Sequence, residues 1–120
     1  MTAKAHRWEE LAADSPMAML TRRRVIGSQA MVSHVTLQRG CEVPVHAHAN
    51  EQFACVLSGR LRFHLPAWEG VPARDVEVGA GGVLHLPAHV PHGATALEDA
   101  VVLDVFSPPS AMTGIDRGRS

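Results

Sequence analysis

The chain has 120 residues, a length that predicts one domain with a hydrophobic core of its own. Hydrophobic residues make up 46% and charged residues 19%, which excludes a disordered chain, and the net charge of −1 gives no field that favours nucleic acid or an anionic membrane. The opening MTAKAHRWEE has no apolar signal segment, and no apolar run reaches the ~20 residues of a membrane-spanning helix. We therefore expect a cytoplasmic protein with no nucleic-acid partner and no membrane partner.

Taken in chain order, the sequence predicts an N-terminal arm over 1–18, in which 6–14 is either a short helix or extended chain. Short apolar segments follow, separated by Gly, Pro, Asn or Asp, and predict strands. These strands span 19–27, 30–38, 51–58, 60–65, 74–78, 82–87 and 100–106. Their spacing predicts an all-β sandwich or barrel over 19–107, with Ser58-Gly59 as a hairpin turn. The remaining residues, 108–120, predict a polar C-terminal tail.

Histidine is unusually frequent, with eight in the chain, and two segments concentrate it. In PVHAHANEQF, strand alternation points His46 and His48 the same way, and also Gln52 if the strand continues. An HxH pair alone more often reflects two surface or hydrogen-bonded histidines than a metal site. The second segment, GGVLHLPAHVPHG at 81–93, contains three more histidines: His85, His89 and His92.

Together the two segments resemble the paired motifs of the cupin superfamily, which are small β-barrels. The first motif is a glycine, five residues, HxH, three or four residues, Glu, six residues and a glycine. Its positions are taken here by Gly40, His46, His48, Gln52 and Gly59. The second motif is a glycine, five residues, Pro-x-Gly, two residues and a histidine, matched by Gly81, Pro87 and His92 with His89 in place of the glycine. The resemblance covers roughly 20–106 and implies a cupin barrel, the double-stranded β-helix or jelly-roll fold.

The resemblance implies one divalent transition metal ion per chain, bound by His46, His48, Gln52 and His92. Gln52 stands where the family most often has Glu, and Glu51 would face the opposite side of the strand. His92 aligns with the motif, whereas His85 and His89 do not. Zn, Ni, Mn, Fe and Cu all stay open, because geometry rather than sequence selects among them. Four neutral ligands leave the ion its full charge, which favours Lewis-acid chemistry over redox chemistry.

An acidic residue stands out in the last predicted strand, AVVLDVF. Asp104 shares a face with Val102 and Phe106, and two environments are open for that face. It is either a solvent-exposed sheet edge or the inside of the barrel mouth beside the metal. In the mouth, Asp104 could act as a general acid or base.

The segment LDVFSPP further resembles the small cupins of pectin and alginate breakdown, which convert 4,5-unsaturated uronates to linear keto forms. This resemblance implies that Asp104 and Phe106 lie beside the metal and the substrate as catalytic residues. It also implies an Arg after the double proline to hold a substrate carboxylate, where this chain has Ser110. An Arg from 22–24 or from 60–62 could replace it, or these could lie on solvated faces.

Three functions compete on these grounds. The first is a metal-dependent isomerase or tautomerase acting on a small, oxygen-rich, anionic acid or carbonyl compound, with a sugar acid suggested by the resemblance. The second is an Fe- or Cu-dependent dioxygenase. The third is a non-catalytic metalloprotein that binds a small molecule. The resemblance also implies a homodimer, because small cupins usually pair through an outer sheet face.

Overall fold

The computed structural model describes residues 2–113 and 115, and almost all regular structure in this part of the chain is β-strand. The strands are β1 (Ala13–Met17), β2 (Leu20–Ile26), β3 (Met31–Leu37), β4 (Glu42–His46), β5 (Glu51–Ser58), β6 (Arg60–Leu65), β7 (Arg74–Gly79), β8 (Val83–Leu86), β9 (His92–Ala96) and β10 (Ala100–Ser107). A single turn of 3₁₀ helix, Trp8–Glu10, precedes them. No helix in the described ranges is long and apolar enough to cross a membrane.

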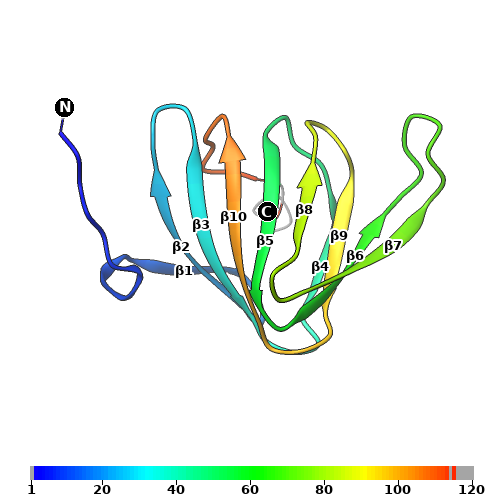
Figure 1. Ribbon diagram of the computed structural model, residues 1–120, viewed down its shortest axis with the longest axis horizontal. Helices are drawn as coiled ribbons and strands as arrows, with labels where there is room; N and C mark the ends of the chain where they lie inside the picture. Colours follow the sequence, from blue (N-terminus) through cyan, green and yellow to red (C-terminus); the bar gives the residue numbers. More distant parts are fainter. Residues whose placement is uncertain (1, 114, 116–120) are drawn as a thin grey trace.

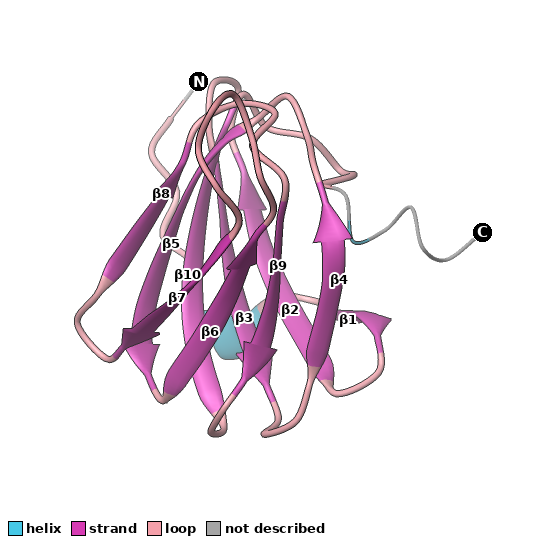
Figure 2. Cartoon of the chain, turned by 90° about the vertical axis from the view of Figure 1, so that its right-hand side faces the viewer, coloured by secondary structure: helices cyan, strands magenta, loops and turns pink. Residues whose placement is uncertain are grey.

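The strands form two antiparallel sheets that face each other (Figures 1 and 2). The larger has the order β1-β2-β3-β10-β5-β8, and the smaller has the order β4-β9-β6-β7. Neighbours in a sheet are often distant in sequence, since β10 pairs with both β3 and β5. The predicted all-β sandwich is therefore confirmed, and its long-range pairings place the last strand, β10, in the middle of the larger sheet.

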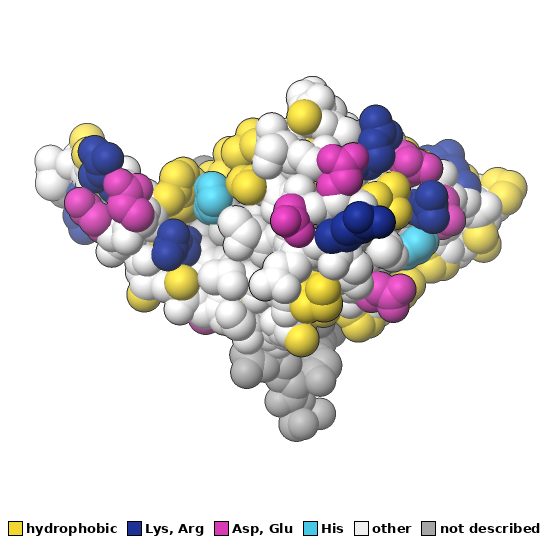
Figure 3. Space-filling model, turned by 90° about the horizontal axis from the view of Figure 1, so that it is seen from below, with side chains coloured by type: hydrophobic (Ala, Val, Ile, Leu, Met, Phe, Trp, Pro, Cys, Tyr) yellow, Lys and Arg dark blue, Asp and Glu magenta, His cyan; other side chains and the backbone are white. Residues whose placement is uncertain are grey.

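The core lies between the two sheets, and strand alternation supplies it. In β5, Ala54 and Val56 are 1% exposed, whereas Phe53 and Leu57 point outward at 37% and 53%. The other strands contribute inward-facing residues such as Val35, Leu61 and Val102 to the same cluster. At the lower end of the molecule, acidic and basic side chains are interspersed with hydrophobic ones (Figure 3).

Three strands lie where none was predicted: β1, β4 and β9. The segment expected as an arm contains β1, which pairs with β2, and 6–14 contains the 3₁₀ turn and the start of β1. Strands β4 and β9 pair with each other, and their sequences, EVPVH and HGATA, have no run of large apolar residues. Such sequences carry little strand signal, so only tertiary pairing identifies them.

The predicted hairpin at Ser58-Gly59 is wrong. Strand β5 pairs with β10 and β8, whereas β6 pairs with β7 and β9, so the chain passes from one sheet to the other at Gly59. The φ of Gly59 is +78°, and an added Cβ would lie 2.2 Å from the carbonyl oxygen of Asp99. Glycine is needed here because the corner is both left-handed and closely packed, not because it closes a hairpin.

Candidate metal centre

Three imidazole rings converge at one end of the space between the sheets. His46 ends β4 and His92 begins β9, and the antiparallel register pairs these two residues directly. His48 lies in the loop that follows β4. The candidate ligand atoms of the three rings all lie within 4.8 Å of one another, so this group could hold a metal ion.

Backbone hydrogen bonds fix the same tautomer in all three rings. The Nδ1 atoms of His46, His48 and His92 lie 2.8, 3.0 and 2.9 Å from the carbonyl oxygens of Pro44, Asn50 and Val90. A carbonyl oxygen only accepts, so each Nδ1 carries the proton and each neutral ring keeps a lone pair on Nε2. This is the arrangement that orients histidines toward a metal.

The Nε2 atom of His92 is buried and has no hydrogen-bond partner among the described residues. A buried acceptor without a donor is costly, so this atom is available to a ligand that the described part of the chain does not supply. Burial also lowers the pKa of His92 to about 4 and lowers the pKa of His46. Both rings are therefore neutral near pH 7, as metal binding requires.

Gln52 extends the group from β5. Its side chain is buried, and its Oε1 lies 3.1 Å from Nε2 of His48. With the proton of His48 on Nδ1, these two atoms present lone pairs to each other, a contact that a shared cation would relieve. The donor set, three imidazoles and one amide oxygen, fits a divalent transition metal.

The two rival histidines lie elsewhere. His85 is on the outer face of β8, where its Nε2 is 2.7 Å from the carboxylate of Glu51 and its ring stacks on Phe53. This contact also confirms that Glu51 faces away from Gln52. His89 is exposed and has a φ of +71°, which explains why the family motif usually has glycine at this position.

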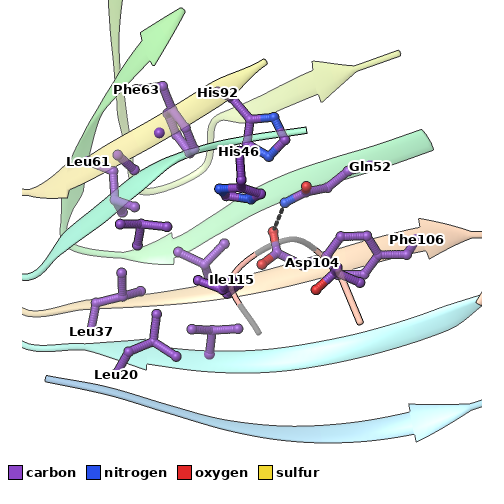
Figure 4. A pocket seen from close by; sticks show the side chains of 16 residues that line it. Leu20, Leu37, His46, Gln52, Leu61, Phe63, His92, Asp104, Phe106 and Ile115 are labelled. Carbon is purple, nitrogen blue, oxygen red and sulfur yellow. Dashed lines mark hydrogen bonds between the residues drawn. The ribbon is translucent and has the colours of Figure 1, made fainter. Parts of the chain in front are cut away.

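Asp104 lies inside the molecule beside the histidine group, and the alternative of a solvent-exposed sheet edge is wrong. Strand β10 is a central strand, and its residues Val102 and Phe106, on the same face, are only 3% and 5% exposed. The Oδ1 atom of Asp104 accepts a hydrogen bond of 2.9 Å from Nε2 of Gln52 (Figure 4). Burial raises the pKa of Asp104 to about 6, and the bond from Gln52 opposes that shift.

Phe106 also lies at the group, with its ring centroid 5.7 Å from that of His48 and nearly perpendicular to it. The structure thus brings together all six residues that the sequence singled out: His46, His48, Gln52, His92, Asp104 and Phe106. Of these, His46, Gln52, His92, Asp104 and Phe106 line a cavity with about 60 Å³ of space for water-sized molecules.

The C-terminal tail completes the wall of this cavity, which the sequence did not indicate. Thr113 is 3% exposed, and Ile115 packs against the core cluster; both line the cavity. Asn50 donates a hydrogen bond to the carbonyl oxygen of Pro108, and Arg24 donates one of 3.0 Å to that of Ala111. The polar composition of 108–115 gave no signal for this role, because two side chains do not form a periodic pattern.

The cavity lining contains no arginine among the described residues. Arg22 is buried but makes a two-bond pair with Asp14, and Arg60 and Arg62 pair with Glu77 on the outer surface. The hydroxyl of Ser110 donates to the carbonyl oxygen of Met112 within the tail. None of the arginines suggested as substitutes for the family's Arg therefore takes that place.

Without metal, two opposed effects of pH on stability are expected, one from the buried rings of His46 and His92 and one from Asp104. Between pH 6.5 and 4, unfolded His92 binds a proton that the folded ring does not, so stability falls by roughly 3 kcal/mol at 1.36 kcal/mol per pKa unit. The folded carboxyl of Asp104 takes up its proton before the unfolded one does, so its contribution rises as the pH falls from about 6. In urea unfolding with a chelator present, we expect the free energy of unfolding to fall more steeply with decreasing pH in Asp104→Asn than in the wild type. Equal falls in the two proteins would contradict the raised pKa of Asp104.

Comparison with known proteins places this geometry in context. A family model described as Cupin domain matches residues 33–106. The structure of KdgF from Halomonas sp. aligns with a TM-score of 0.80 and 26% identity, over 92% of this chain and 97% of that one. An RmlC-like cupin from Shewanella frigidimarina aligns with a TM-score of 0.77 and 22% identity, over 92% and 95% of the two chains.

An oxalate decarboxylase variant from Bacillus subtilis aligns with a TM-score of 0.81 and 19% identity, over 95% of this chain and 33% of that chain. These structural matches confirm the predicted barrel fold. A search of curated protein sequences gives no match.

Proposed function

The chain belongs to the cupin family, and on that premise we propose that it is a metal-dependent isomerase or tautomerase acting on a small oxygenated acid or carbonyl compound. One observation carries the proposal: the amide of Gln52 joins the histidine group to Asp104, with Oε1 beside His48 and Nε2 bonded to Oδ1 of Asp104. A ligand set and an ionisable carboxyl group are thereby held at one end of one cavity. The 26% identity to KdgF from Halomonas sp. and the sequence resemblance to uronate-converting cupins support it.

In this proposal His46, His48, His92 and Gln52 hold one divalent metal ion. When bound, the ion supplies Lewis-acid polarisation of a substrate oxygen. Asp104 moves the proton: its carboxylate accepts the hydrogen of an enol hydroxyl and returns it to the adjacent carbon, so no oxidant is consumed. A pKa of about 6 suits a group that must both accept and donate near neutral pH. Phe106 packs against His48 and keeps water from the reacting atoms.

Proton exchange offers a test that does not need the natural substrate. Metal-loaded protein is expected to accelerate exchange of the C3 hydrogens of 2-oxobutanoate for deuterium in D₂O, followed by NMR, because enolisation is the half-reaction that Asp104 would catalyse. Removal of the metal with a chelator should abolish the exchange. Oxygen uptake without exchange would instead support the dioxygenase, and binding without either would support a non-catalytic metalloprotein. Metal analysis by plasma mass spectrometry of untagged protein identifies the ion.

We further propose a homodimer formed through the outer face of the larger sheet. Phe53, Leu57 and Val83 are 37%, 53% and 59% exposed on β5 and β8. Leu103 and its outward-facing neighbours continue this apolar surface along β10. Adjacent exposed apolar side chains of this kind favour association.

Light scattering is expected to give twice the mass of one chain. The variant Leu57→Lys should shift the protein toward monomer, because it places a charge in the apolar surface. Val71→Lys is the matched control, since Val71 is 47% exposed and lies outside this surface. A monomeric wild type, or equal effects of the two variants, would contradict the proposed interface.

A further inference from the structure

The cavity beside the metal centre is divided into two ends of different chemistry (Figure 4). His46, Gln52, His92 and Asp104 gather at one end. Aliphatic side chains line the other end, among them Leu20, Leu37 and Leu61, and Ile115 lies between the two ends. The three leucines come from both sheets, and Ile115 comes from the C-terminal tail.

Hydrogen-bonding side chains are scarce in the lining away from the polar end. Among the described lining residues, Thr113 is the one polar side chain besides the polar end itself, and Asp104 is the one that carries a full charge. A uronate or another sugar acid would bring several hydroxyl groups into this apolar space. Each hydroxyl buried without a partner lowers affinity by about tenfold or more.

We infer that the substrate has an oxygenated head that chelates the metal, such as a 2-oxo acid or its enol, and a short hydrocarbon tail, rather than the hydroxylated chain of a sugar acid. This inference rests on the proposed function and specifies its substrate class. The head lies at the polar end, and the tail extends toward Leu37 and Leu61. The cavity has about 60 Å³ of space for water-sized molecules, which leaves room for a short tail only.

Ile115 takes a specific part in this arrangement, because it borders the cavity between the polar end and the aliphatic end and so limits the room for the tail (Figure 4). It belongs to the C-terminal tail, nine residues beyond Phe106 of β10. The presence of Ser110 where the family has Arg agrees with an apolar substrate tail, since the Ser110 hydroxyl bonds to Met112 within the C-terminal tail. Ser110 and Ile115 belong to the same segment.

Binding to the metal-loaded protein tests the inference by calorimetry, with 2-oxopentanoate compared to its 4,5-dihydroxy derivative. These two acids share the head and the chain length and differ only in two hydroxyl groups. We expect 2-oxopentanoate to bind at least tenfold more tightly, and affinity to rise about fourfold per methylene from pyruvate to 2-oxopentanoate. Equal or tighter binding of the dihydroxy acid would overturn the inference.

Two variants test the role of Ile115. Ile115→Ala is expected to raise the affinity for 2-oxoheptanoate relative to 2-oxopentanoate by threefold or more, because the smaller side chain enlarges the cavity and leaves room for a longer tail. Ile26→Ala is the control, since Ile26 is 55% exposed and outside the cavity. An unchanged length preference in Ile115→Ala would overturn this part of the inference.

The same samples separate the two proposals. Metal-dependent exchange of the 2-oxobutanoate hydrogens together with preference for the dihydroxy acid would leave the proposed function standing and overturn the substrate class. Failure of every acid to bind, with no exchange, would overturn both.

Discussion

Asp104→Asn is expected to lower the rate of metal-dependent proton exchange by about 10² to 10⁴-fold while leaving one metal ion bound per chain. The reason is that Asn keeps an oxygen that can accept the hydrogen bond from Nε2 of Gln52 but cannot take up or release the proton. The orientation of the Gln52 amide, and with it the metal centre, should therefore survive. Rates of 2-oxobutanoate exchange and metal content, measured on the same preparation, check the two halves of this result.

Two further variants make that prediction specific. Asp75→Asn changes an exposed carboxylate that bonds His64 on the outer face of the smaller sheet, and it should leave the exchange rate unchanged. Asp104→Ala removes the acceptor as well as the proton carrier, so the Gln52 amide loses its orientation and metal affinity should fall by about 10 to 100-fold. Retained exchange in Asp104→Asn would exclude Asp104 as the acid or base; loss of metal in that variant would reduce its role to positioning Gln52.

The candidate site was more accessible to sequence reasoning than the fold around it. His46, His48 and Gln52 are close in sequence, and strand alternation predicted that they share a side. The structure brings them together differently: His46 ends β4, His48 lies in the following loop and Gln52 lies on β5 of the other sheet. His92 needed the family spacing, because nothing local shows that its strand pairs with β4. Asp104 stayed ambiguous for a similar reason: whether a polar residue in an apolar strand faces solvent depends on which strands flank β10.

The features that sequence did not indicate are those created by tertiary contacts. Strands β4 and β9 have too few large apolar residues to be recognised, yet their register pairs His46 with His92. Gly59 looked like a hairpin turn because a left-handed glycine serves equally well at a corner between sheets. The tail lines the cavity through isolated contacts from Thr113 and Ile115, which no periodic pattern in the sequence predicts. These errors concern the path of the chain, whereas the chemical roles of the residues could be predicted from the sequence.

His92→Ala is expected to change stability little without metal and to lower it strongly with metal. In the wild type, Nε2 of His92 is buried and has no partner within the part of the chain that the structure describes, and such a group costs about 1–3 kcal/mol when it stays unsatisfied. In the presence of a chelator, removing the ring therefore removes the cost of the unsatisfied Nε2. This gain offsets the packing free energy that is lost with the ring. With metal present, the wild type gains binding free energy that the variant cannot, so only the wild type should show a large rise in melting temperature.

The matched control for this result is His85→Ala, which deletes an equally large ring on the outer face of β8. Its melting temperature should rise with added metal as in the wild type, and its metal affinity should be unchanged. For His92→Ala, we expect metal affinity to fall by more than about 100-fold, beyond the range typical of residues that only support a ligand. If His92→Ala bound metal as the wild type does, or if its chelated form lost several kcal/mol of stability, the unpartnered Nε2 would have a structural explanation. The assignment of the metal to these three histidines would then fail, and with it the Lewis-acid mechanism, because Asp104 would have no polarised substrate oxygen beside it.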